Sequence, residues 1–173
     1  MTGARRWLLR SVVPTLALML GACATPPSVS PIPSPPARVA NDVLFHAIGL
    51  VGTPYRWGGN TPESGFDCSG LVDYVFRTSA GLVLPRHSGD IAELDVPRVN
   101  ADQLQPGDLL FFGSHHQVSH VAIYVGQGRF VHAPNTGGTV RLDKLDGEYW
   151  REHFLYAKRV LERAPDEAAM ASN

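Results

Sequence analysis

The chain has 173 residues, of which 44% are hydrophobic and 18% are charged, and its formal net charge is −1. This composition is typical of a soluble globular protein, and the length leaves room for one domain with a hydrophobic core of its own. The near-neutral charge, without a basic stripe interleaved with aromatic side chains, argues against nucleic acid as a partner.

Residues 1–22 have the pattern of a signal peptide. Three arginines among the first ten residues precede the apolar run Ser11–Leu20, which is too short to span a bilayer. The segment ends in small residues before Cys23 and so resembles a bacterial lipobox, which implies cleavage before Cys23 and acylation of its thiol and new amino group. An ordinary signal peptide followed by a chance cysteine is the alternative. In lipoproteins of this kind Ala24, with no aspartate after the cysteine, implies an outer-membrane anchor that faces the periplasm of a Gram-negative host.

Residues 23–40 predict a tether that follows the lipidated cysteine. Six of the 14 prolines of the chain lie in this stretch. Because few amide donors remain, we expect neither helix nor strand here. At about 3.1 Å per residue, an extended tether of this length would hold a domain about 50 Å from a membrane.

The globular domain is predicted over residues 41–163, and it begins with two helices. Asn41 or Asp42 is expected to cap the first helix. Its apolar stripe would consist of Leu44, Phe45, Ile48 and Val51. After a glycine-rich loop, a second helix would be capped by Asp67 and ended by Gly81.

Five strands are predicted after the turn at Pro106-Gly107. They are expected at residues 108–112, 119–125, 129–133, 140–142 and 155–160. Glycines 126 and 128 would close a hairpin between the second and third strands. Helices followed by a meander of strands indicate an α+β fold, with helices packed on an antiparallel sheet. The polar tail, residues 164–173, is expected to be disordered.

Cys68, in the sequence GFDCSG, is the only cysteine of the predicted domain. If Cys23 carries lipid, Cys68 has no partner for an intramolecular disulfide, and a free thiol in an oxidising compartment suggests a function. In the first turn of a helix, the macrodipole and the free amide donors lower the pKa of a thiol, whereas the charge of Asp67 raises it. A small buried apolar side chain is the alternative to a nucleophile.

Two histidines lie in the predicted hairpin, His120 in its first strand and His132 in its second. A turn centred on Gly126 would make the two imidazoles direct cross-strand neighbours, and a turn centred on Gln127 would make them diagonal neighbours. In either register one imidazole can act as a base toward Cys68 while the other orients it. A pair of surface histidines on the solvated face of the sheet is the alternative.

Three further histidines are expected to have no catalytic role: His87 and the adjacent pair His115 and His116, which lie in a polar loop. A metal site built from this pair with His120 and His132 would match no standard zinc spacing. The sequence therefore predicts no metal site and no cofactor.

Five short motifs occur in order along the chain: PYRWGG, DCSG around Cys68, PGDLLFF, HVAIYVG from His120, and VHAP around His132. Together they resemble the NlpC-type papain-like cysteine peptidases, which cut peptide bonds in peptidoglycan. The resemblance covers residues 41–160 and implies a papain-like α+β fold, with N-terminal helices packed on an antiparallel sheet of about five strands. The lipoprotein signal and the proline-rich tether resemble the murein endopeptidase branch.

The resemblance also implies roles for single residues. Cys68 would be the nucleophile, His120 the general base and then acid, and His132 the third, orienting residue. The hydroxyl of Tyr55, together with the Cys68 amide, would hold the substrate and the developing oxyanion. The other substrate-binding residues that the resemblance implies are Asp67, Ser69, Arg86 and Ser88. Beyond them, residues 89–92 depart from the family pattern and leave the subsite specificity open.

These features favour a lipid-anchored periplasmic endopeptidase that hydrolyses stem peptides or cross-links of peptidoglycan through a thioester in cell-wall remodelling. The bond could be the D-alanine–diaminopimelate cross-link or the D-glutamate–diaminopimelate bond within one stem. Trp57 could pack against a stem peptide or fill the core. The alternatives are a non-catalytic wall-binding lipoprotein and a thiol-dependent acyltransferase.

Overall fold

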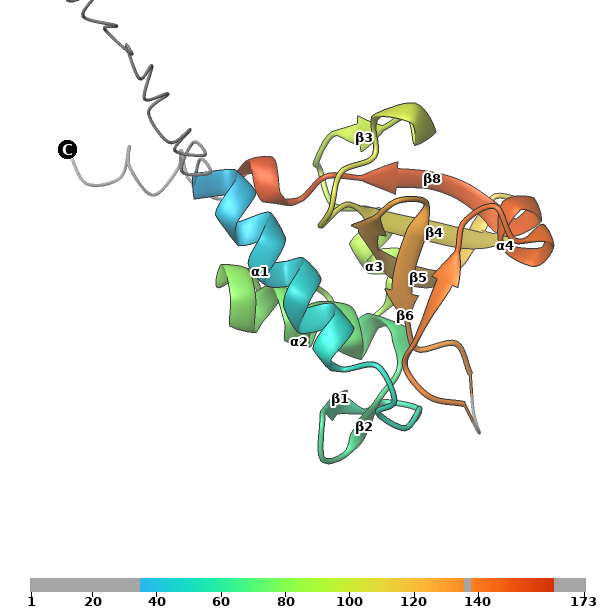
Figure 1. Cartoon of the computed structure of the whole chain (residues 1–173). Coiled ribbons are helices and arrows are strands. Elements are labelled where there is room, and N and C mark those ends of the chain that lie inside the picture. Colours follow the sequence, from blue (N-terminus) through green and yellow to red (C-terminus); the bar gives the residue numbers. More distant parts are fainter. Residues whose placement is uncertain (1–34, 136–137, 164–173) are drawn as a thin grey trace, which may run out of the picture. The chain divides into compact units, whose positions relative to one another are not determined.

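The computed structural model describes residues 35–135 and 138–163 (Figure 1). The predicted signal peptide, Cys23, most of the predicted tether and the tail 164–173 lie outside these residues. In the described part of the chain, no helix combines the length and the apolar character needed to cross a bilayer. The helices are α1 (Pro35–Gly49), α2 (Cys68–Ala80), α3 (Ser88–Ala92) and α4 (Glu148–His153), with 3-10 turns at Ala101–Gln103 and Leu161–Arg163. The strands are β1 (Asn60–Thr61), β2 (Gly65–Phe66), β3 (Arg98–Val99), β4 (Leu109–Ser114), β5 (Gln117–Gly126), β6 (Arg129–His132), β7 (Arg141–Lys144) and β8 (Phe154–Lys158).

Six strands form one antiparallel sheet in the order β3-β8-β4-β5-β6-β7, while β1 and β2 pair separately. The predicted α+β fold is therefore confirmed, because the helices come first and each of the five expected strands is present. The sequence did not predict β1, β2 or β3, each of which has two residues, too few to show an alternating pattern.

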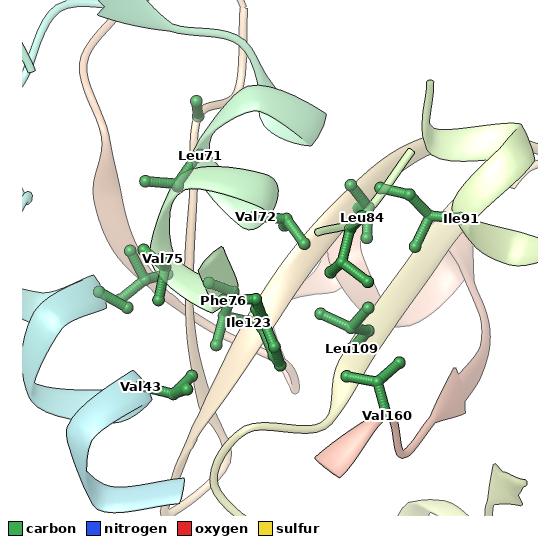
Figure 2. Close-up of a cluster of buried hydrophobic side chains, with 14 of the residues drawn as sticks. Val43, Leu71, Val72, Val75, Phe76, Leu84, Ile91, Leu109, Ile123 and Val160 are labelled. Atoms are coloured by element: carbon green, nitrogen blue, oxygen red, sulfur yellow. The ribbon is translucent and has the colours of Figure 1, made fainter. Parts of the chain in front are cut away.

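One face of the sheet is covered by α1, α2 and α3. Figure 2 shows Val43 of α1 and Val75 of α2 in a cluster with Ile91 of α3 and with Leu109 and Ile123 of the sheet, all fully buried. Burying an aliphatic side chain of this size contributes about 1.5–3 kcal/mol. This packing fixes α2 against β5, and with it the position of Cys68.

The opposite face of the sheet has a second, mainly aromatic cluster. Phe112 and Phe130 are buried there with their ring centroids 5.2 Å apart, and Trp150 of α4 packs on both. The two faces follow the alternation of β5, since Ala122 lies in this cluster while its neighbour Ile123 lies in the other.

Helix α1 corrects the predicted domain boundary at residue 41. It begins at Pro35, so residues 35–40 of the expected tether are helical, and Asn41 and Asp42 lie inside the helix instead of capping it. Proline is compatible with the first turn of a helix, where its missing N–H has no intrahelical acceptor and its fixed φ is already suitable. Proline content therefore did not distinguish the tether from the start of a helix.

The buried face of α1 also differs from the expected stripe. Val43, Ala47 and Leu50 are buried, whereas Phe45 is 69% exposed and Ile48 is 42% exposed. Both sets recur at helical spacing, so periodicity alone did not identify the face that meets α2.

The hairpin of β5 and β6 has the second of the two expected registers. Ile123 pairs with Val131, which centres the turn on Gln127. Gln127 has a φ of 54° and is flanked by two glycines that also have positive φ. His120 and His132 are consequently diagonal neighbours on the same face of the sheet.

Candidate active site

Cys68 is the first residue of α2, and Asp67 holds the turn that begins this helix. Asp67 Oδ1 accepts a hydrogen bond from the Gly70 amide at 2.7 Å, and its Oδ2 accepts one from the Gly58 amide at 2.8 Å. The helix ends at Gly81, which has a φ of 68°. Both predicted ends of α2 are therefore confirmed, and they leave the free, partly exposed thiol of Cys68 at the helix start.

A cavity of about 220 Å³ lies beside Cys68. It is lined by the residues expected to bind substrate: Tyr55, Asp67, Ser69, Arg86 and Ser88. Trp57 also lines it and is 84% exposed, so the core-filling alternative for this residue is wrong. His87, for which no catalytic role was expected, also lines this cavity.

β5 brings His120 to the same region. The backbone of Val121, the next residue, is near enough to Cys68 to act on its thiol and lower the thiol pKa. Ser119, on the other side of His120, is the extra residue of a β-bulge in the β4–β5 pairing. Ser119 lines both the Cys68 cavity and a second cavity of about 170 Å³, which His120 and Trp150 line. The two cavities therefore meet at Ser119, which places the thiol of Cys68 near the segment of β5 that carries His120.

A chain of hydrogen bonds leads from His120 away from the thiol. His120 Nε2 lies 3.0 Å from His132 Nδ1, and His132 Nε2 lies 3.0 Å from Asp143 Oδ2. The same carboxylate oxygen accepts hydrogen bonds from Arg141 Nε and Trp150 Nε1, each at 2.9 Å. The imidazole of His132 is completely buried, and its ring centroid lies 4.7 Å from that of Trp150. The alternative of two surface histidines is therefore wrong.

Burial keeps both imidazoles neutral at physiological pH. It lowers the pKa of His120 to about 3, with a smaller contribution from the charge of Arg141. Burial also lowers the pKa of His132 to about 4, although Asp143 opposes the shift. Burial by itself would raise the pKa of Asp143, but the hydrogen bonds from His132 and Trp150 and the charge of Arg141 lower it overall. The described arrangement is thus a neutral histidine pair ending on an ionised carboxylate.

The pKa of the Cys68 thiol is raised, contrary to the effect expected from the helix start. Burial is the largest cause, and the charge of Asp67 adds to it, while the amides of Val121 and Ser69 oppose the shift without reversing it. The pKa of Tyr55 is also raised, first by burial and then by the nearby Cys68 and Asp67, so its hydroxyl remains a hydrogen-bond donor at neutral pH. The resting site therefore holds a neutral thiol.

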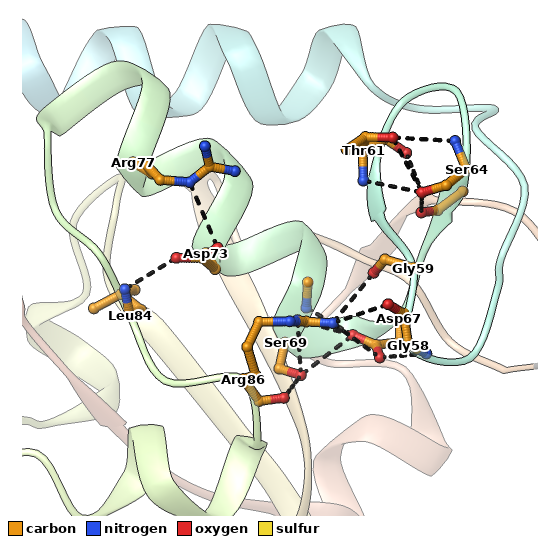
Figure 3. A network of polar contacts seen from close by, with 12 residues as sticks. Gly58, Gly59, Thr61, Ser64, Asp67, Ser69, Asp73, Arg77, Leu84 and Arg86 are labelled. Atoms are coloured by element: carbon orange, nitrogen blue, oxygen red, sulfur yellow. Dashed lines mark hydrogen bonds and ion pairs between the residues drawn. The ribbon is translucent and has the colours of Figure 1, made fainter.

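Arg86 ties the loop before α2 to the helix start (Figure 3). Its guanidinium lies 3.4 Å from Asp67 Oδ1 and donates to the carbonyl of Gly58 at 3.3 Å. Ser69 Oγ donates to the backbone carbonyl of Arg86 at 2.6 Å. Because Asp67, Ser69 and Arg86 bind one another, they shape one wall of the cavity as a unit.

His115 and His116 lie away from these groups, in the turn between β4 and β5, where both are exposed and have positive φ. Among residues 35–135 and 138–163, no group of three or more His, Cys, Asp or Glu side chains has an arrangement that could hold a metal ion. The expectation that the protein works without a metal remains a prediction.

Sequence reasoning missed Asp143, Trp150 and Ser119. The predicted strand 140–142 ended one residue before Asp143, and a three-residue run is too short to reveal which side chains share a face with His132. Trp150 lies in α4, between the predicted strands 140–142 and 155–160, in a stretch to which no role was assigned from the sequence. Ser119 depends on a bulge, for which the sequence gives no signal.

Comparisons with known proteins place this site in context. Residues 52–159 match the NlpC/P60 family. Over 127 residues the chain is 39% identical to the murein DD-endopeptidase MepH of Escherichia coli, a match that covers 72% of the chain and 46% of MepH. Over 153 residues it is 38% identical to the "probable endopeptidase NlpC" of the same organism, covering 83% of the chain and 94% of NlpC. The chain thus spans about half the length of MepH and nearly all of NlpC.

A solved structure of a protein of this family is similar to this chain in its fold. The crystal structure of a Bacillus cereus protein of this family superposes with a TM-score of 0.66 at 34% sequence identity, covering 76% of the chain and 41% of that protein.

Proposed function

The chain belongs to the NlpC/P60 family, and we propose that it is a cysteine endopeptidase that hydrolyses stem peptides or cross-links of peptidoglycan. The observation that carries this proposal is the placement of the free thiol of Cys68, which lies at a helix start and lines a cavity together with Tyr55 and with Ser119, the neighbour of His120. The names of two relatives, murein DD-endopeptidase MepH and "probable endopeptidase NlpC", support the reaction class.

The reaction begins with a neutral thiol and a neutral imidazole. As the sulfur attacks the amide carbonyl, the thiol proton passes to His120, and a tetrahedral oxyanion forms. The Tyr55 hydroxyl and the Cys68 amide would stabilise this oxyanion. His120 then gives the proton to the leaving amine, so that a thioester remains on Cys68. Water, deprotonated by His120, hydrolyses the thioester and restores the thiol.

The scissile bond is proposed from the name of one relative. MepH is a murein DD-endopeptidase, and this supports the D-alanine–diaminopimelate cross-link rather than the D-glutamate–diaminopimelate bond. The masses of released muropeptides distinguish them, because cutting a cross-link converts dimers into monomers, whereas cutting within a stem shortens the peptide.

We also propose that Cys23 carries lipid and anchors the protein to the outer membrane, facing the periplasm. The support is the signal-like pattern of residues 1–22 and the small residues before Cys23. Cells that express the chain and are fed an alkyne-bearing palmitate should label it, whereas Cys23→Ser should remain unlabelled. Equal labelling of both chains would contradict the anchor.

The catalytic proposal is tested with purified sacculi and the whole chain. The protein should release muropeptides, and Cys68→Ala should lower the rate about a thousandfold or more. Ser114→Ala changes an exposed residue at the end of β4 and is the matched control. Equal release by the protein and Cys68→Ala would remove Cys68 as the nucleophile.

Two other outcomes identify the alternative functions. Binding to sacculi without release of muropeptides, from sacculi or from soluble fragments, would favour a wall-binding lipoprotein. Transfer of the acyl group to an added amine in place of water would favour an acyltransferase, because both reactions share the thioester.

A further inference from the structure

The hydrogen bond between His120 and His132 can be made in two ways, and the two are not equivalent for catalysis. A neutral imidazole carries one proton, so one nitrogen donates and the other accepts. Either His120 Nε2 donates to His132 Nδ1, or the reverse. In the first arrangement, the other nitrogen of His120, Nδ1, is an unprotonated base. In the second, His120 Nδ1 carries the proton and cannot accept one from a thiol.

We propose that Asp143 is a positioning residue that selects the first arrangement. An ionised carboxylate only accepts hydrogen bonds, so the nitrogen of His132 that faces it, Nε2, must carry the proton. His132 Nδ1 is then an acceptor, and the contact of 3.0 Å with His120 requires that His120 Nε2 donate. His120 Nδ1 is left free of a proton.

The surroundings of Asp143 favour this role. Oδ2 receives donors from His132, Arg141 and Trp150 at 2.9–3.0 Å, a set that favours the ionised carboxylate. The position is also buried on the side of His132, which has no exposed surface, so water does not compete for His132 Nε2. The carboxylate thus acts on a group that it does not touch, His120, through the ring between them.

The positioning role of Asp143 rests on the proposed function of His120 as the base. The test therefore measures the protonation of His120 separately from the hydrolysis of peptidoglycan. Long-range ¹H–¹⁵N NMR of the whole chain reports which nitrogen of each histidine carries the proton. We expect a protonated Nε2 and an unprotonated Nδ1 for His120 in the unmodified protein. A proton on His120 Nδ1 would overturn the inference, whether or not the protein hydrolyses peptidoglycan.

Variants then test the cause. Asp143→Ala should give a mixture of tautomers at His120 and lower kcat on soluble muropeptides on the order of 100-fold, with KM nearly unchanged. Asp143→Asn should restore much of the activity, because the donors of Arg141 and Trp150 would orient the amide oxygen toward His132. Arg151→Gln removes an exposed charge of α4 but keeps the carboxylate and its donors, and its tautomers should not change. A folded Asp143→Ala variant with the tautomers of the unmodified protein would contradict the inference.

If Asp143→Ala does not fold, Asp143→Asn and the unmodified protein still carry the test, since the tautomers of His120 are measured in each. Absence of muropeptide release from the unmodified protein would refute the proposed function alone. The tautomer result would stand independently of it.

Discussion

His120 Nε2 lies 3.0 Å from His132 Nδ1, although the two residues are diagonal and not directly opposed on β5 and β6. Their rings meet nearly at right angles, with an interplanar angle of 86°, and both pack against Trp150. An aromatic wall therefore holds the pair in one geometry, and the same wall shields the rings from water, His132 completely and His120 in part. The low pKa values follow from this burial.

The first prediction is that acid destabilises the fold through these two histidines. The unfolded chain takes up their protons near pH 6.5, whereas the folded chain does so only near pH 4 for His132 and pH 3 for His120. Between those values the unfolded state binds more protons, so the free energy of unfolding falls as the pH falls. From pH 7 to pH 5 we expect a loss of about 2 kcal/mol for each histidine.

Urea unfolding at the two pH values measures this loss. His132→Gln keeps a hydrogen-bonding side chain that cannot take up a proton, and it should show about half of the pH dependence. Identical unfolding curves for the unmodified protein at pH 7 and pH 5 would refute the buried neutral pair.

The second prediction concerns the reactivity of Cys68. The charge of Asp67 raises the pKa of the thiol, so Asp67→Asn should lower that pKa and shift the pH profile of alkylation by iodoacetamide to lower pH. Asparagine is also a good N-cap, which favours retention of the helix start. Glu63→Gln removes a carboxylate that is not among the causes of the Cys68 shift, and it is the control. A profile that moves equally in both variants would show that the Asp67 charge does not act on the thiol.

Local rules predicted much of this site correctly. The cap at Asp67 and the stop at Gly81 depend on neighbouring residues only, and the shared face of His120 and His132 follows from strand alternation. The resemblance also indicated which residues would surround Cys68, and these residues line the cavity beside it.

What the sequence did not predict depends on contacts between distant elements. The sequence indicated that the helix start would lower the pKa of the Cys68 thiol and that Asp67 would raise it, but it did not show the burial that is the largest cause of the raised pKa. Asp143 belongs to the site because β7 pairs with β6, so that its carboxylate reaches His132. The start of α1 at Pro35 was missed because proline is compatible with both a tether and a first helical turn.

The third prediction tests the close contact between the first turn of α2 and the loop before it. A Cβ atom at Gly70 would overlap the backbone oxygen of Gly59 and crowd Arg86 Nη1 at 2.9 Å. Gly70→Ala should therefore destabilise the protein by about 1–3 kcal/mol. It should also slow muropeptide release, because the displaced loop is next to Cys68.

Gly89→Ala is the matched control, since a Cβ at Gly89 in α3 would meet no atom within 4 Å. Its stability should change by less than about 1 kcal/mol, with alanine favoured by helix propensity. Equal stability of the two variants in urea would show that the contact with Gly59 relaxes without cost.

The fourth prediction concerns the ion pair that joins the start of β4 to the end of β8. Arg159 Nε lies 2.8 Å from Asp108 Oδ1, and Arg159 Nη2 lies 2.9 Å from Asp108 Oδ2. Asp108 is only 1% exposed, so Arg159→Ala would leave a buried carboxylate without its charged partner. We expect a loss of about 3–5 kcal/mol, measured by urea unfolding.

Arg77→Ala removes the same side-chain type from a weaker pair and serves as the control. Arg77 is 44% exposed and lies 3.6 Å from Asp73, which also accepts a hydrogen bond from the Leu84 amide. Solvent screens such a pair, so this change should cost less than about 1 kcal/mol. Asp73 and Asp108 are both buried, so similar losses in the two variants would mean that the lower exposure and bidentate contact of Arg159 do not set the strength of its pair, and Arg159→Lys would then retain full stability. If burial and bidentate geometry both matter, Arg159→Lys should lie between the alanine variant and the unmodified protein, because lysine keeps the charge but cannot bind both carboxylate oxygens in the same fixed geometry.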